Sequence, residues 1–140
     1  MLKFSIYIEP ILSALQNVFM PVLPISGNKR YYMKAVRLLE LVGLKGRLHH
    51  KPGELSGGEK QRVAIARLLV MDPSVMLADE PTGNLDTKTS AEIIDIMLRL
   101  NKKIKRIFIV VTHDRRLAEK AERVLYLCDG RLSSVCPEGF

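Results

Sequence analysis

Apolar residues in the first half of the chain recur at the spacing of amphipathic helices. From residue 29 onward they fall every three or four positions and are followed by a glycine in the place of a C-terminal cap: Tyr32, Val36, Leu39, Val42 and Gly43. The pattern predicts helices over residues 13–20, 29–42 and 57–70. Asp72 and Pro73 end the last of these. Residues 1–70 are therefore expected to form a mostly helical subdomain, in which residues 1–9 have the weakest pattern.

After residue 73 the apolar residues fall in short continuous runs instead. VMLA at 75–78 and IFIVV at 107–111 are typical of parallel strands that are buried on both faces of a sheet. Between them lies a predicted helix over residues 87–100, with one apolar face made of Ile93, Ile94, Met97 and Leu98. This order of elements is a βαβ unit, and it predicts an α/β fold.

The remaining residues extend this unit. A short helix at 116–121 leads into a predicted third strand at 123–127, and Asp129 and Gly130 turn the chain into a last short strand. Residues 71–140 are thus expected to form a parallel-sheet βαβ core, with the third strand continuing the sheet.

The composition is that of a soluble globular protein, with 140 residues of which 47% are hydrophobic and 26% charged. The net charge of +7 would suit nucleic acid, anionic lipid or a phosphate-bearing ligand. The basic residues are spread along the chain, so we interpret them as a solvated surface and expect no nucleic-acid partner. The two cysteines, Cys128 and Cys136, match no metal motif and predict reduced thiols in a cytosolic protein.

The first 25 residues are apolar, but no run in them is long enough to span a membrane. One acidic residue and three prolines interrupt the stretch before it reaches the roughly 20 residues that a spanning helix needs. The four are Glu9, Pro10, Pro21 and Pro24. We therefore expect this segment to lie inside the domain.

The stretch LSGGEKQR, at residues 55–62, places two glycines at the predicted start of a helix. Ser56 and Glu59 fit a capping box, in which each side chain bonds the backbone N–H of the other. Glycine is unfavourable in a helix by roughly 1 kcal/mol relative to alanine, so the capping box does not account for Gly57 and Gly58. Bare backbone at a helix N-terminus lets an anion such as a phosphate approach free N–H groups. A plain capped helix and a phosphate contact both remain open at this point.

Polar residues follow the predicted strands at their carboxyl ends, where open α/β sheets bind ligands. Asp79 and Glu80 end the first strand, and His113 follows the second. An aspartate after four apolar residues is able to hold Mg²⁺, and the following glutamate to polarise an attacking water. Asp86, at the end of PTGNLD, is equally placed to cap the next helix. Solvated turn residues remain the alternative for each of these positions.

Taken together, LSGGEKQR, ADEPTGNLD and VTHD resemble, in order and spacing, the ATPases of ATP-binding cassette (ABC) transporters over residues 10–132. The chain is similar to the branch that serves lipoprotein release, macrolide export and cell-division permeases. The resemblance implies a site residue by residue: Leu55, Ser56, Gly57, Gly58 and Glu59 as the signature motif, Asp79 as the Walker B metal ligand, Glu80 as the catalytic base, Leu85 and Asp86 as the D-loop, and His113 as the switch histidine.

The resemblance also implies cofactors and partners. The cofactors are ATP and Mg²⁺. One partner is a second cassette in a head-to-tail dimer, in which each signature motif closes on the nucleotide of the other chain. The other partner is a membrane permease subunit that the helical subdomain contacts. The expected location is peripheral, at the cytoplasmic face of the cell membrane.

The P-loop pattern G-x-x-x-x-G-K-[ST] does not occur in the sequence. The nearest approach runs from Gly53 to Gly58, but Glu59 and Lys60 stand where Lys and Ser or Thr are required. No glutamine lies near Phe4, where the family carries its Q-loop residue. The chain is therefore expected to be the C-terminal part of a cassette, to leave one apolar face of its sheet uncovered, and to be inactive in ATP hydrolysis by itself.

Two other functions remain possible from the sequence. A non-enzymatic regulatory or interaction remnant of a cassette is compatible with every motif above. A DNA-repair or chromosome-maintenance ATPase of the same fold is disfavoured, because no heptad-bearing segment precedes the signature motif.

Overall fold

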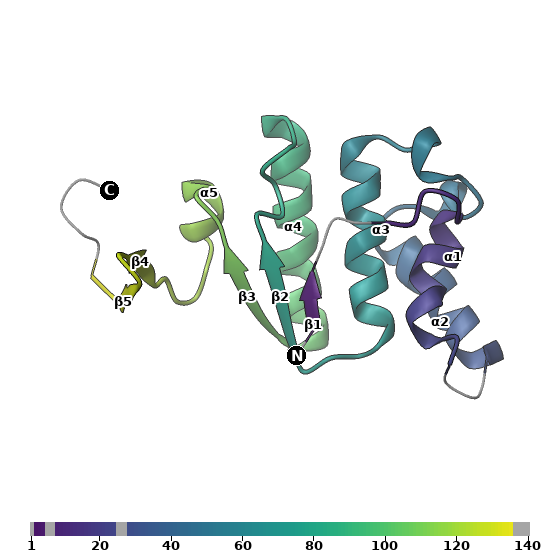
Figure 1. The fold of residues 1–140 in the computed structure, drawn as a ribbon, viewed down its shortest axis with the longest axis horizontal. Coiled ribbons are helices and arrows are strands. Elements are labelled where there is room, and N and C mark those ends of the chain that lie inside the picture. Colours follow the sequence, from purple (N-terminus) through teal and green to yellow (C-terminus); the bar gives the residue numbers. More distant parts are fainter. Residues whose placement is uncertain (1, 5–7, 25–27, 136–140) are drawn as a thin grey trace.

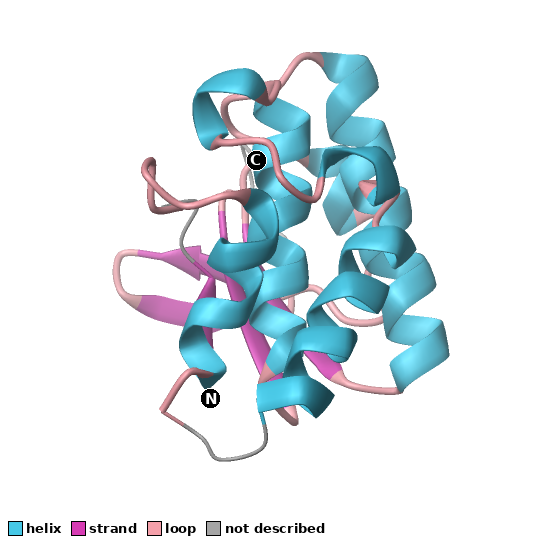
Figure 2. Ribbon diagram, turned by 90° about the vertical axis from the view of Figure 1, so that its right-hand side faces the viewer, coloured by secondary structure: helices cyan, strands magenta, loops and turns pink. Residues whose placement is uncertain are grey.

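Three helices, α1 (Ala14–Phe19), α2 (Asn28–Leu41) and α3 (Gly57–Val70), pack together at one end of the molecule in the computed structural model (Figure 1). The structure describes residues 2–4, 8–24 and 28–135. Figure 2 views this helical end directly, with the strands behind the helices. The helices predicted over 13–20, 29–42 and 57–70 are confirmed within two residues at each end. Short 3₁₀ turns connect them at Met20–Val22, Lys45–Arg47 and Pro52–Glu54.

The helices bury a shared apolar core. Four of the residues in it are fully inaccessible to solvent: Val18, Leu39, Val63 and Val70. Asn17 is also fully buried, and its side-chain amide donates to the carbonyl oxygens of Glu9 and Leu12 at 3.0 Å each, which satisfies its polar group. The segment before α1 is therefore held against the helices by one buried asparagine.

The second half of the chain contains a three-stranded parallel sheet in the order β1 (Leu2–Phe4), β2 (Val75–Asp79), β3 (Ile107–Val111). Helix α4 (Thr87–Ile104) connects β2 to β3, so the predicted βαβ unit is confirmed. Strand β1 lies where the sequence pattern was weakest and inside the range expected to be mostly helical. Three residues are too short for a recognisable period, and their strand conformation depends on pairing with β2.

The two faces of this sheet have different surroundings. Met76 and Ala78 of β2 are buried in the same core as α3 and α4, and their register partners Phe108 and Val110 pack against it. The opposite face contains Val75 and Leu77 of β2 and Ile107, Ile109 and Val111 of β3. We call these five residues the open face, because the three from β3 are 59%, 47% and 59% exposed. The expectation of an uncovered apolar face is thereby confirmed.

The expected third parallel strand at 123–127 is wrong. After the short helix α5 (Arg115–Ala118), strand β4 (Tyr126–Cys128) pairs antiparallel with β5 (Arg131–Ser133), and the hairpin stands apart from the main sheet (Figure 1). Asp129 and Gly130 have φ values of 49° and 76°. Positive φ at both central residues closes the tightest hairpins, so the turn pairs the strand locally.

Among the helices of the described residues, none combines the length and the apolar character that crossing a bilayer requires.

Candidate functional site

The start of α3 is a complete capping box. The Ser56 hydroxyl accepts from the Glu59 backbone N–H at 3.2 Å, and the Ser56 backbone N–H donates to Glu59 Oε2 at 2.8 Å. Leu55, which precedes them, is buried in the core at 5% exposure. The capping interpretation of Ser56 and Glu59 is therefore confirmed, and the buried Leu55 side chain fixes the start of the motif to the core.

The second carboxylate oxygen of Glu59 lies against the loop before the motif. Arg47 Nε donates to Glu59 Oε1 at 3.3 Å, and Arg47 Nη1 lies 2.9 Å from His50 Nε2. The backbone hydrogen bond from Ser56 holds the pKa of Glu59 below its usual value, and Arg47 adds to the effect. Arg47 is twelve residues from Glu59, so no local spacing in the sequence indicated this contact.

The two glycines of the motif have different surroundings. Gly57 is exposed, and a Cβ built there would lie 3.1 Å from Leu85 Cδ2, the far end of a flexible side chain. Gly58 is buried, and a Cβ built there would overlap the Cγ2 methyl of Thr89 in α4. Packing between α3 and α4 therefore favours glycine at position 58, because a side chain there would force Thr89 or the helices to shift. No local pattern in the sequence indicates this contact, because Thr89 lies 31 positions away from Gly58.

Asp86 caps helix α4. Its Oδ1 accepts from the Thr89 backbone N–H at 3.0 Å, and its Oδ2 accepts from the Thr89 hydroxyl at 2.5 Å. The hydrogen bond from the Thr89 side chain is the main reason that the pKa of Asp86 lies below its usual value. Thr89 thus contacts both Asp86 and Gly58, and the starts of α3 and α4 lie side by side.

This cap predicts a pH dependence of stability. A carboxylate whose pKa is lower in the folded chain stabilises the fold above its unfolded pKa of about 4, and the stabilisation is lost as the pH falls through the folded pKa. Asp86→Asn keeps a capping residue but cannot titrate. We expect the free energy of unfolding to fall less steeply between about pH 5 and pH 3 in Asp86→Asn than in the wild type. Urea denaturation at several pH values measures this, and parallel curves would contradict it.

Glu80 and His113 meet at the carboxyl edge of the sheet. Glu80 Oε1 lies 2.8 Å from His113 Nδ1 and accepts from the His113 backbone N–H at 3.1 Å. Glu80 Oε2 accepts from the Thr112 hydroxyl at 3.2 Å. Glu80 has a positive φ of 45°, and its N–H donates to Val111 O at 2.8 Å, so the chain leaves β2 in a fixed direction. The sequence predicts Glu80 and His113 at this edge, but no motif in it indicates the contribution of Thr112.

Asp79 is exposed at the end of β2, where it is in register with Val111. A cavity of about 300 Å³ lies beside Glu80 and His113 and is also lined by Leu85, Arg115 and Arg116. Leu85 therefore lies next to two groups of predicted residues. One is the start of α3 at Gly57, and the other is the sheet edge at Glu80.

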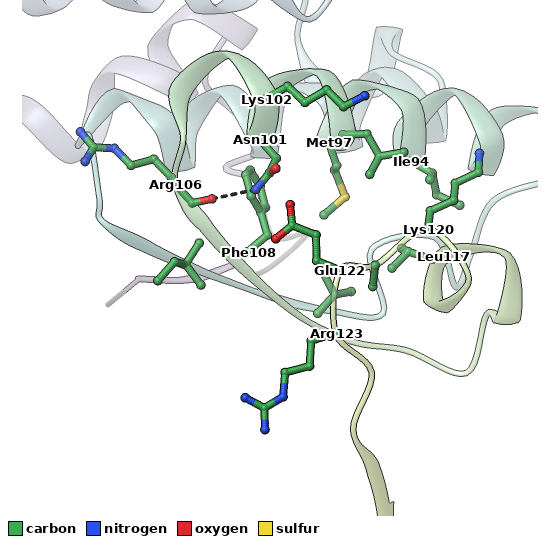
Figure 3. A pocket seen from close by; sticks show the side chains of 14 residues that line it. Ile94, Met97, Asn101, Lys102, Arg106, Phe108, Leu117, Lys120, Glu122 and Arg123 are labelled. Atoms are coloured by element: carbon green, nitrogen blue, oxygen red, sulfur yellow. Dashed lines mark hydrogen bonds between the residues drawn. The ribbon is translucent and has the colours of Figure 1, made fainter. Parts of the chain in front are cut away.

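A larger cavity of about 430 Å³ lies elsewhere, between α4, β3 and the segment after α5 (Figure 3). Ile94, Met97 and Phe108 form its apolar wall, and Asn101 Nδ2 donates to Arg106 O at 2.8 Å beside it. It contains none of the residues predicted for the site. Size alone does not identify the functional site here.

Comparison with known proteins agrees with these motifs. A model of the ABC transporter family matches residues 7–83. The chain is 54% identical over 128 residues to the lipoprotein-releasing system ATP-binding protein LolD of Legionella pneumophila (strain Paris), covering 90% of this chain and 56% of that one. It is 50% identical over 133 residues to LolD of Xanthomonas oryzae pv. oryzae (strain MAFF 311018), covering 94% and 54%. The chain thus spans about half the length of these relatives.

Solved structures give the same result. The fold is similar to that of the ATP-binding cassette MJ0796 in a dimeric, post-hydrolysis state bound to ADP and Pi, with a TM-score of 0.77 and 38% identity. The match covers 94% of this chain and 61% of that one. A second dimeric structure of MJ0796, described as a bacterial ABC transporter cassette, also matches with a TM-score of 0.77, at 39% identity. The chain therefore belongs to the ABC transporter family and has the fold of the C-terminal part of its ATP-binding cassette.

Proposed function

We propose that the chain provides the signature half of the ATP-binding subunit of a transporter, which couples ATP binding and hydrolysis to transport through a membrane permease. The proposal is carried by two groups of residues that solvent reaches, one at the start of α3 and one at the sheet edge. The bare start of α3 at Gly57 faces solvent, and Glu80 is held by His113 at the carboxyl edge of the sheet.

The start of α3 has the properties of a phosphate contact. It begins a 14-residue helix, whose N-terminal N–H groups carry partial positive charge. Gly57 has no Cβ to keep an anion away from these groups, and the capping box fixes their direction. We infer that Leu55 to Glu59 close on the nucleotide of a second cassette. The MJ0796 cassettes, whose fold this chain shares, are described as dimeric.

The sheet edge fits ATP and Mg²⁺. Asp79 offers an exposed carboxylate, and oxygen ligands of this kind are those that Mg²⁺ prefers. Bound Mg-ATP would supply the phosphoryl group and neutralise its charge. Within the chain, Glu80 is placed to accept a proton from water, His113 holds the Glu80 carboxylate in position, and Asp86 lies next to the signature motif at the start of α4.

The sequence has no P-loop, so the 140-residue chain by itself is expected not to hydrolyse ATP. The P-loop that shares Mg-ATP with Asp79 has to come from residues outside this sequence. We further infer contact with a membrane permease, and a peripheral location at the cytoplasmic face of the membrane. The LolD relatives are named as parts of a lipoprotein-releasing system, and a lipoprotein cargo is proposed on that basis.

Pairing with a complete cassette tests the signature contact. Gly57→Asp places a carboxylate against the partner's phosphate, while the helix start tolerates or favours acidic residues. Gly53→Asp is the matched control, because it makes the same charge change at an exposed glycine with no atom within 4 Å of the added Cβ. We expect Gly57→Asp to weaken ATP-dependent pairing with a full-length cassette at least about tenfold, as several charge-assisted contacts are lost, and Gly53→Asp to pair like the wild type.

A non-enzymatic remnant is the second candidate. It is favoured by one observation: the capping box and the packing of Gly58 against Thr89 account for most of the motif without any nucleotide. That function predicts pairing or permease binding that does not depend on ATP, and equal behaviour of the two aspartate variants. Size-exclusion chromatography with and without ATP distinguishes the two candidates.

A further inference from the structure

Glu59 carries a negative charge at the place where the proposed function requires an anion to bind. It is the third residue of helix α3, and its carboxylate accepts from the Ser56 backbone N–H at 2.8 Å. The first N–H groups of a helix have no partner inside the helix, so a carboxylate in the first turn is able to accept from several of them. A Glu59 side chain that moved freely would therefore compete with a phosphate for the backbone at Gly57 and Gly58.

Arg47 restricts this movement. Its Nε donates to Glu59 Oε1 at 3.3 Å, while Glu59 Oε2 accepts from the Ser56 N–H. With a partner for each oxygen, the carboxylate is held in one orientation, between Ser56 and the loop that contains Arg47. The Arg47 side chain is 49% exposed and the Glu59 side chain 19%. An ion pair this close to solvent contributes little to stability, so stability alone does not account for the contact.

The loop that contains Arg47 is itself held in place. Arg47 is the last residue of a 3₁₀ turn, and its Nη1 lies 2.9 Å from His50 Nε2. The Leu15 N–H donates to Leu48 O at 2.9 Å. The Ala14 N–H donates to His50 O at 2.8 Å. The loop thus supplies partners for the N–H groups at the start of α1, and it presents the Arg47 guanidinium to Glu59 from a fixed backbone.

We propose that Arg47 is a positioning residue for the signature motif: it holds the Glu59 carboxylate aside, so that the start of α3 stays open to a phosphate group. The inference rests on the proposed function for the identity of the anion, which is the nucleotide of a second cassette. It goes further by assigning a role in nucleotide contact to a residue outside the motif. Arg47 acts through Glu59 and does not touch the nucleotide.

ATP-dependent pairing of the 140-residue chain with a full-length cassette that contains a P-loop measures this role. Arg47→Ala releases the Glu59 carboxylate and should weaken the pairing at least about fivefold, because like charges that meet across an interface are unfavourable. Arg47→Lys still presents a positive charge to Glu59 and should pair within about twofold of the wild type.

A Glu59→Gln background separates positioning from direct attraction of the phosphate. Glutamine also completes a capping box, but it has no charge with which to compete for the N–H groups. If Arg47 acts through Glu59, the two substitutions are coupled, and Arg47→Ala should change the pairing by less than about twofold in this background.

Lys45→Ala is the matched control. Lys45 is a cation in the same 3₁₀ turn, and it lies 3.9 Å from Glu40 in an exposed ion pair that does not involve the motif. It should pair like the wild type. Urea denaturation tests for a purely structural role, and Arg47→Ala and Lys45→Ala should both unfold at the midpoint of the wild type.

An equal loss of pairing by Arg47→Ala in both backgrounds would overturn the proposal, because it would show that Arg47 attracts the phosphate directly. A loss of pairing accompanied by a lower urea midpoint would overturn it as well. Unchanged pairing of Arg47→Ala beside ATP-dependent pairing of the wild type would reject the role of Arg47 and leave the proposed function standing. A wild-type chain that does not pair in response to ATP would reject both.

Discussion

Glu80→Gln is expected to lower ATP turnover by at least about 100-fold in a cassette completed by joining a P-loop half to this chain, which is the usual contribution of a general base. The amide that replaces the carboxylate cannot accept a proton from water. It is nearly isosteric and can still accept from the Thr112 hydroxyl, which donates to Glu80 at 3.2 Å. Nucleotide binding should therefore persist while hydrolysis is lost, and release of phosphate measured beside nucleotide binding separates the two.

Glu92→Gln is the control for this substitution. Glu92 lies on the solvent side of α4, where its carboxylate is 3.5 Å from Arg62 and its side chain is 47% exposed. An exposed ion pair of this kind contributes little to stability. The completed cassette with Glu92→Gln should turn over like the wild type, and a similar loss in both variants would show that Glu80 is not the catalytic base.

Gly58→Ala is expected to destabilise the chain by about 1–3 kcal/mol, the usual range for overpacking a well-packed site. The added methyl would overlap Thr89 Cγ2, so the Thr89 side chain or the two helices have to shift. Without that contact the change would be stabilising by up to about 1 kcal/mol, because alanine is the better helix former. The sign of the change in the free energy of unfolding, measured by urea denaturation, thus decides whether packing fixes this glycine.

Thr89→Ser is the second substitution in a double-mutant test of the contact between Gly58 and Thr89. It removes the Cγ2 methyl and keeps the hydroxyl that donates to Asp86 at 2.5 Å. In the double variant the overlap is absent, so Gly58→Ala should cost at least about 1 kcal/mol less in the Thr89→Ser background than in the wild type, as expected for residues in direct contact. Additive effects of the two substitutions would contradict the packing explanation.

The same contact changes which substitution tests the signature motif. A side chain at position 58 would overlap Thr89, so a substitution there tests helix packing and nucleotide contact together. Gly57 has only the far end of Leu85 nearby and is the position at which folding and nucleotide contact are separable.

Elements whose boundaries are determined locally were predictable from the sequence. Helix α3 begins at a capping box and ends before Asp72 and Pro73, and it was predicted to the residue. Strands β2 and β3 follow from their continuous apolar runs. The sequence predicted the turn from β4 into β5, but not that the hairpin would stay apart from the main sheet, because an apolar strand pattern does not show which sheet a strand joins.

The site was predictable to a similar degree. The meeting of Glu80 and His113 follows from a rule about sheet edges, and it needed only the positions of two strands. The contacts of Arg47 with Glu59 and of Thr89 with Gly58 depend on how separate segments pack. Neither has a period or a motif that a single sequence displays, and both were found only in three dimensions.

The contact between Gly58 and Thr89 also limits how the residues at the starts of α3 and α4 are able to move. The first turn of α3 lies directly against the first turn of α4, and the Arg62–Glu92 pair joins the same two helices one turn further on. Close-packed elements transmit displacement instead of absorbing it. Ser56 and Asp86 therefore belong to one closely packed unit, and under the proposed function a force that a second cassette applied to either residue would be transmitted to the other.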